Sequence, residues 1–168
     1  MKYHYSFVIR LLLLLIPPQL FSLILAPLTI YIGFLVLFNF SPVIDGNLII
    51  INGIRFEFVE ACIASYAYYF LWILCFFTKD ISFVNRIKII GYGFLLIFIM
   101  NIFRIWLIIY LALNYGFFWF NLVHLFFWKF LMGVYVALVW IGLVRYYKIN
   151  SIPIYDDIKT LIKDIRKC

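Results

Sequence analysis

Charged residues are scarce in this chain of 168 residues. Only 12% of the residues are Asp, Glu, Lys or Arg, about half the share found in an ordinary soluble domain. Hydrophobic residues make up 68% of the chain and aromatic residues 23%. Because a domain of this size buries roughly 70% of its chain surface, a soluble fold would leave much apolar surface in water. The composition excludes a soluble globular enzyme and a disordered chain, and it predicts an integral membrane protein with a single bundle of helices.

Cysteine is scarce as well. Cys62, Cys75 and Cys168 are an odd number without metal-ligand spacing, which argues against a disulfide framework and against a metal site. The sequence also lacks a glycine-rich phosphate loop and an internal repeat, so we predict no metal or organic cofactor. The net charge of +7 would suggest a nucleic-acid partner in a soluble protein. Here the basic residues flank apolar segments, so we predict no nucleic-acid partner.

Long apolar runs predict an all-α membrane protein with about four transmembrane helices. About 20 apolar residues cross a bilayer. The predicted spans are residues 11–38, 61–78, 89–113 and 121–144. In the first span, Pro17, Pro18 and Pro27 predict either one kinked helix or two short re-entrant helices. The absence of a small-residue cleavage site predicts an uncleaved anchor instead of a signal peptide.

Residues 43–60 have a different character. Two β-rich runs, 48–51 and 54–59, are joined by Asn52-Gly53, which predicts a short β-hairpin. An open sheet edge cannot lie in lipid, so we expect the hairpin at the membrane surface or just outside it.

The placement of basic residues predicts the orientation. They gather at the N-terminus, between the second and third spans and after the fourth span, whereas Arg55 lies on the other side. By the positive-inside rule, both termini of a multi-pass plasma-membrane protein lie in the cytoplasm. Residues 1–149 then form one transmembrane domain. Residues 150–168 repeat apolar positions at helical spacing and predict a cytoplasmic amphipathic helix on the membrane surface.

Three residues with chemical potential are predicted at one depth. Cys62 begins the second span, and His124 lies about three residues into the fourth, both at the outer end. Arg104 lies 16 residues beyond Lys88, or about 24 Å from the cytoplasmic face at about 1.5 Å per residue. A charged residue within a span is costly and usually functional. The thiol, guanidinium and imidazole are therefore expected together near the outer leaflet.

This combination predicts nucleophilic catalysis. A cysteine near a helix N-terminus and beside a cation is favoured as thiolate. His124 would act first as base and then as acid, and Arg104 would stabilise the thiolate or an oxyanion. Asn101 and Asn121 each lie three residues before the arginine and the histidine, where they hold these side chains or help helices associate. Lys129 is also intramembrane, and its role is left open.

The order of these motifs resembles a known family. Glu60-Ala61-Cys62, then Asn101-Ile102-Phe103-Arg104, then His124 in the following span is similar to the exosortase/archaeosortase family, and the short chain to its minimal archaeal members. The similarity covers roughly residues 40–145. It implies that Cys62, Arg104 and His124 are catalytic, with Glu60, Asn101 and Asn121 in support.

The sequence departs from the family pattern directly after the cysteine. Ile63 stands where the family has a hydroxyl residue, and Ala64 where it has glycine.

The resemblance also implies an activity: a membrane cysteine transpeptidase or protease that cleaves a C-terminal sorting signal of secreted proteins. The protein would then pass from Cys62 to an acceptor, such as a membrane lipid, or to water. Two other functions fit the sequence. Arg104, His124 and Lys129 could line an ion or proton path or bind a lipid headgroup without catalysis. An assembly factor that docks through its amphipathic tail is the third.

Overall fold

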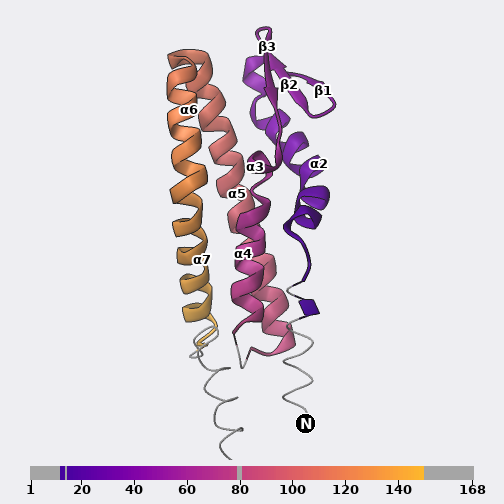
Figure 1. Cartoon of the computed structure of the whole chain (residues 1–168), viewed down its shortest axis with the longest axis vertical. Helices are drawn as coiled ribbons and strands as arrows, with labels where there is room; N and C mark the ends of the chain where they lie inside the picture. The colour runs from indigo at the N-terminus through magenta and orange to yellow at the C-terminus, as the bar shows by residue number, and fades with distance from the viewer. Residues whose placement is uncertain (1–11, 14, 79–80, 150–168) are drawn as a thin grey trace, which may run out of the picture.

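The computed structural model is mostly helical, 76% of it, and carries one small sheet (Figure 1). It describes residues 12–13, 15–78 and 81–149. Within these residues, three helices are long and apolar enough to cross a membrane: Pro18–Val36, Phe83–Tyr115 and Phe117–Tyr146. This confirms the predicted helical class with apolar spans. The predicted amphipathic helix at 150–168 lies outside the described residues.

The first long helix begins later than expected. Helix α2 covers Pro18–Val36, with Pro17 as its N-cap and Pro27 inside it. Proline suits the first helical turn because its fixed φ is already helical and it lacks an N–H that would otherwise be unpaired. The two adjacent prolines therefore begin α2, whose bounds differ from those of the single predicted span 11–38. A short 3-10 turn, η1 (Phe38–Phe40), follows α2.

The predicted second span is divided in two. A one-turn helix, α3 (Glu60–Ile63), ends at Ala64, and α4 (Ser65–Phe76) follows. Ala64 has φ 59° and ψ 31°, a left-handed conformation that interrupts the helix. The 12 residues of α4 extend about 18 Å, which is less than the roughly 30 Å of a hydrocarbon core.

The remaining helices exceed their predicted bounds. Helix α5 (Phe83–Tyr115) has 33 residues and extends about 50 Å. The Ser82 side chain caps its start by accepting a hydrogen bond from the Asn85 N–H. At its other end Gly116, with φ 90°, turns the chain into the last long helix. That helix consists of α6 (Phe117–Phe126), a π-helical turn η2 (Phe127–Leu131) and α7 (Met132–Tyr146).

The predicted hairpin is present and belongs to a three-stranded antiparallel sheet. Its strands β1 (Val43–Asp45), β2 (Leu48–Ile51) and β3 (Ile54–Glu57) lie in the order β1-β2-β3. Ile51 faces Ile54 across the predicted Asn52-Gly53 turn, whose two residues both have positive φ. The prediction did not include β1.

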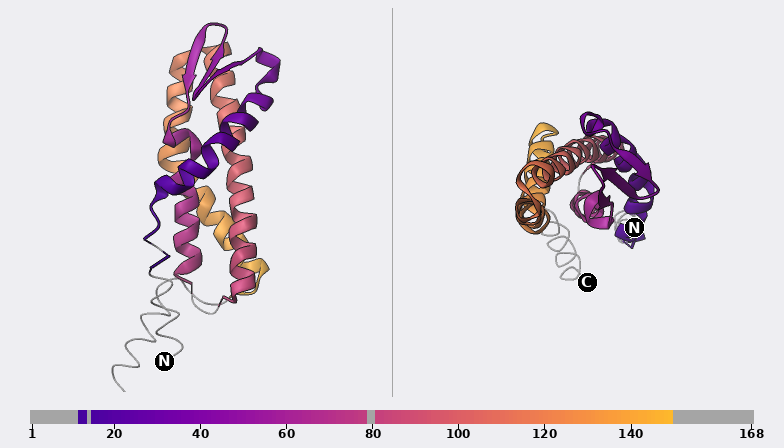
Figure 2. Two further views of the ribbon diagram at one scale, coloured as in Figure 1. Left: turned by 90° about the vertical axis from the view of Figure 1, so that its right-hand side faces the viewer. Right: turned by 90° about the horizontal axis from the view of Figure 1, so that it is seen from above.

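The sheet packs beside one end of the bundle, and α4 packs toward the other (Figures 1 and 2). Ile49 and Phe56 of the sheet share an apolar cluster with Ile105 and Ile109 of α5. A second cluster joins α4 to α5 and α7 and includes the fully buried Leu71. Helix α3 connects the sheet to α4, so the one-turn helix that carries Cys62 lies between the two halves of the core.

Candidate functional site

Cys62 lies in the one-turn helix, outside the apolar helix α4. Its side chain is half-buried, and its sulfur lies 3.9 Å from the backbone oxygen of Glu57 in β3. The thiol lines a cavity of about 160 Å³ together with residues of β3, α5 and α6. Apolar side chains make up most of the cavity wall, among them Phe56, Ile105 and Phe120. An acyl group attached to the sulfur would have an apolar pocket beside it.

Two fully buried side chains of α5 hold the cysteine segment. Asn101 donates a hydrogen bond from Nδ2 to the Cys62 carbonyl at 2.8 Å, and Arg104 donates from Nη2 to the Ala61 carbonyl at 2.7 Å. A helix of one turn leaves its carbonyls without partners inside the helix, so these two bonds stabilise it. The sequence predicted that Asn101 either holds the Arg104 side chain or helps helices associate. Its hydrogen bond joins α5 to α3 and so agrees with the second role.

Two of the three guanidinium nitrogens of Arg104 make no hydrogen bond among the described residues. Its side chain has no exposed surface, yet Nε and Nη1 make no hydrogen bond in the part of the chain that the structure describes. The guanidinium is close enough to Cys62, Tyr68 and His124 for their charges to interact. Arg104 is thus the residue around which the thiol and the imidazole are grouped.

His124 lies on α6 behind an aromatic ring. Its imidazole stacks on Phe120, with ring centroids 5.6 Å apart and planes 19° apart. Phe120 also packs against Phe56 and lines the cavity that holds Cys62. Among the described residues the histidine makes no hydrogen bond to Cys62 or Arg104, and its buried Nδ1 has no partner. The structure therefore brings His124 near the arginine without joining it to the thiol.

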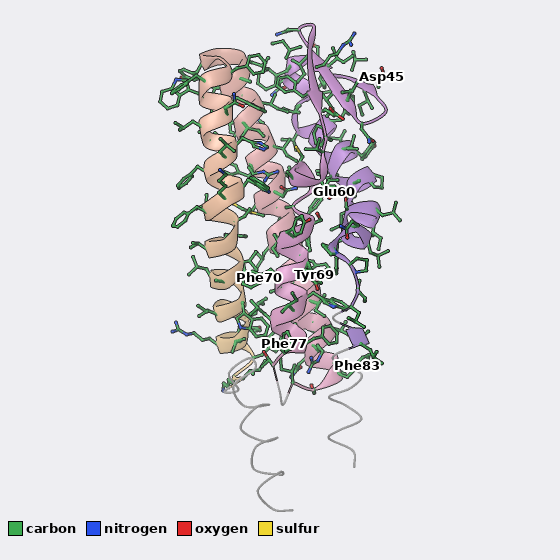
Figure 3. The ribbon with its side chains drawn as sticks, in the orientation of Figure 1. Asp45, Glu60, Tyr69, Phe70, Phe77 and Phe83 are labelled. Carbon is green, nitrogen blue, oxygen red and sulfur yellow. The ribbon has the colours of Figure 1, made fainter. Side chains whose placement is uncertain are left out.

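The other predicted residues differ in their surroundings. Asn121 is exposed and does not contact His124 through a hydrogen bond in the described range. Glu60, also exposed, is the first residue of α3 and lies between the sheet and α4 (Figure 3). A carboxylate at this position interacts favourably with the helix N-terminus. Lys129 is exposed on the π-helical turn η2.

No protein-family model matches the chain, and no curated protein or solved structure is significantly similar to it.

Two buried polar side chains near the site escaped the sequence analysis as functional candidates. The hydroxyl groups of Ser65 and Tyr68 are buried and make no hydrogen bond in the described residues. Both residues lie on α4, three positions apart and therefore on one helix face. Tyr68 lies close enough to Arg104 for their charges to interact. The helical spacing from Cys62 could not reveal this face, because the left-handed Ala64 interrupts the helix between Cys62 and α4.

The surroundings of Cys62 favour the neutral thiol. Burial raises the pKa of the Cys62 thiol, and the Arg104 guanidinium and the backbone bond to Val59 lower that pKa by less. The predicted effects of the helix N-terminus and the nearby cation are thus outweighed by loss of solvent. A nucleophilic Cys62 would need a base to accept its proton during attack. Among the described residues, no group of three or more His, Cys, Asp or Glu could hold a metal ion.

Proposed function

We propose that the protein is a membrane-embedded cysteine transpeptidase or protease that cleaves a C-terminal sorting signal of secreted proteins. One observation supports this most: buried Arg104 binds the carbonyl next to Cys62, and its charge reaches both the thiol and His124. The resemblance to the exosortase/archaeosortase family assigns the same three residues. Ala64 adds support, because its left-handed conformation is one that glycine, the family's residue there, adopts freely.

The proposed reaction has two halves. The Cys62 sulfur attacks the scissile carbonyl carbon while the thiol proton passes to His124. Arg104 stabilises the oxyanion of the tetrahedral intermediate. The C–N bond then breaks, His124 gives the proton to the leaving amine, and the C-terminal segment departs. An amine, a hydroxyl or water next attacks the thioester, His124 takes its proton, and the proton returns to the sulfur as the product leaves.

Because His124 makes no hydrogen bond to the thiol among the described residues, this scheme requires the two groups to approach when substrate binds. Catalytic hydrogen bonds are often loose in free enzymes and tighten in the complex. A substrate with its own membrane helix would be held beside the site, which gives the proximity that intramolecular reactions have. We propose the plasma membrane as the location, with about four spans, both termini in the cytoplasm and Cys62 toward the outer face.

The proposal is tested in the producing cells. Secreted proteins that end in an apolar segment and a basic tail are followed by peptide mass spectrometry of the membrane fraction. We expect Cys62→Ala, Arg104→Ala and His124→Ala cells to retain the terminal segments that wild-type cells remove. Cys75→Ala is the matched control, since Cys75 is a buried cysteine of α4 away from the cavity. Removal at the normal rate in Cys62→Ala cells would refute the mechanism.

A membrane-impermeant thiol reagent separates this proposal from a non-enzymatic ion path. The proposal predicts that Cys62 is labelled from outside intact cells and that labelling is lost in Cys62→Ala. Absence of labelling, together with pH-dependent ion flux, would favour the path.

A further inference from the structure

A second cavity, with a volume of about 350 Å³, is lined in part by Glu60 and Ala61 of α3. Arg104, Lys129 and Glu60 are the charged residues among its lining. The rest of the wall is mainly apolar and comes from α4, η2 and α7, as with Phe70, Trp128, Met132 and Val136. Cys62 is not part of this wall. The cavity is thus a separate site that shares Arg104 with the proposed catalytic one.

The buried guanidinium of Arg104 in the cavity wall favours the binding of an anion. Arg104 has no exposed surface, one hydrogen bond to a neutral carbonyl, and two nitrogens without partners among the described residues. An ionised group buried away from water is costly unless it is paired. In the described part of the chain no carboxylate forms an ion pair with Arg104. A ligand with anionic oxygens would therefore suit this cavity. The planar guanidinium can donate hydrogen bonds to two such oxygens at once.

Lys129 adds a second cation at a structurally unusual place. It lies within η2, the π-helical turn between α6 and α7. Such turns insert one extra residue into a helix and are frequent at functional sites. With Glu60 included, the charged side chains of the wall sum to one positive charge. A group with one negative charge would balance them.

We propose that this cavity binds a phosphate group through Arg104 and Lys129. A phosphodiester carries one negative charge and oxygens for both cations, and the apolar wall suits the hydrocarbon part of a phospholipid. The same oxyanion chemistry is offered by inorganic phosphate, so the source of the phosphate is decided by experiment. The proposal is independent of cysteine chemistry.

The contribution of the Lys129 charge to binding is tested with the purified full-length protein in detergent. Phosphatidylglycerol binding is measured by native mass spectrometry, and inorganic phosphate binding by the shift of the thermal midpoint. We expect Lys129→Gln to weaken binding about tenfold, since it removes a charge-assisted hydrogen bond to the phosphate. Lys88→Gln, which removes the same charge from an exposed position of α5 outside the cavity wall, is the matched control.

The role of the cavity's free volume is tested with variants that leave the charge unchanged. Gly133 lines the cavity and Gly142 does not, and both lie on α7. A side-chain carbon added at either glycine would meet no atom within 4 Å, so both positions have room for a larger residue. Gly133→Leu should reduce binding at least as strongly as Lys129→Gln, and Gly142→Leu should leave it unchanged. Cys62→Ser should bind normally even if it abolishes processing, which separates failure of this proposal from failure of the proposed function.

The outcomes are distinct. Loss of phosphatidylglycerol binding in both cavity variants supports a lipid headgroup, and loss of the phosphate-induced shift alone supports free phosphate. Equal effects of the cavity variants and their controls would overturn the proposal.

Discussion

The connection of Asn101 and Arg104 to α3 is the most informative feature at the scale of single residues. Two side chains of α5 reach the adjacent carbonyls of Ala61 and Cys62. The position of the thiol thus depends on residues about 40 positions later in the chain.

Removing the Asn101 bond should destabilise the protein. We expect Asn101→Leu to lower the free energy of unfolding by about 1–3 kcal/mol, because the part-buried Cys62 carbonyl loses its donor. Asn114→Ala is the control, since Asn114 is exposed and its side chain donates a hydrogen bond to the Tyr110 carbonyl of its own helix. Thermal unfolding in detergent measures the difference, and equal midpoints for the two variants would contradict the assigned role.

Alkylation of Cys62 should depend on Arg104. Burial raises the pKa of the thiol and Arg104 lowers it, so Arg104→Gln raises the pKa further. Since a higher pKa leaves less thiolate at neutral pH, we expect slower reaction with N-ethylmaleimide. In the wild type the rate should still increase as pH rises past the usual range of a cysteine thiol. Arg104→Lys, which keeps the charge, is the control, and a folded Arg104→Gln variant that reacts faster would contradict this electrostatic role.

At the scale of helices and strands, local sequence signals predicted the long helices and the hairpin, whereas tertiary contacts determine the break at Ala64. Long apolar runs and the Asn52-Gly53 turn are local signals, and the helices and hairpin they predict are present. The break at Ala64 was not predicted because alanine strongly favours helix. Just before Ala64, the carbonyls of α3 accept hydrogen bonds from α5. No local sequence pattern encodes such bonds between distant residues. The sequence analysis grouped Lys129 with Arg104 as one alternative, but it did not predict the cavity that both residues line, for the same reason.

The packing of α4 on α5 depends on a glycine. A side-chain carbon at Gly93 would overlap Cδ2 of the fully buried Leu71, whereas one at Gly91 would meet no atom within 4 Å. We expect Gly93→Ala to destabilise the protein by about 1–3 kcal/mol through overpacking. Gly91→Ala should be neutral or stabilise it by up to about 1 kcal/mol, because alanine favours helix. Unfolding midpoints measure both, and an equally stable Gly93→Ala protein would show that the two helices pack differently.

At the scale of the whole molecule, the arrangement in the membrane is open to direct test. Exposed apolar side chains cover the long helices, as expected for surfaces that face lipid. We expect a cysteine introduced at Asn114, in a background without the native cysteines, to react with an impermeant reagent from outside intact cells. A cysteine introduced at Lys88 should react only after the membrane is opened. The reverse pattern would invert the proposed orientation.

The central claim is that Cys62 forms a thioester with a secreted protein. The most direct measurement is mass spectrometry of the purified protein from producing cells, with and without hydroxylamine, which cleaves thioesters. We expect an adduct on the Cys62 peptide of the wild-type protein that hydroxylamine removes and that the Cys62→Ala and His124→Ala proteins lack. Normal loss of C-terminal segments in cells that contain only Cys62→Ala, with no adduct on the wild-type protein, would contradict the claim.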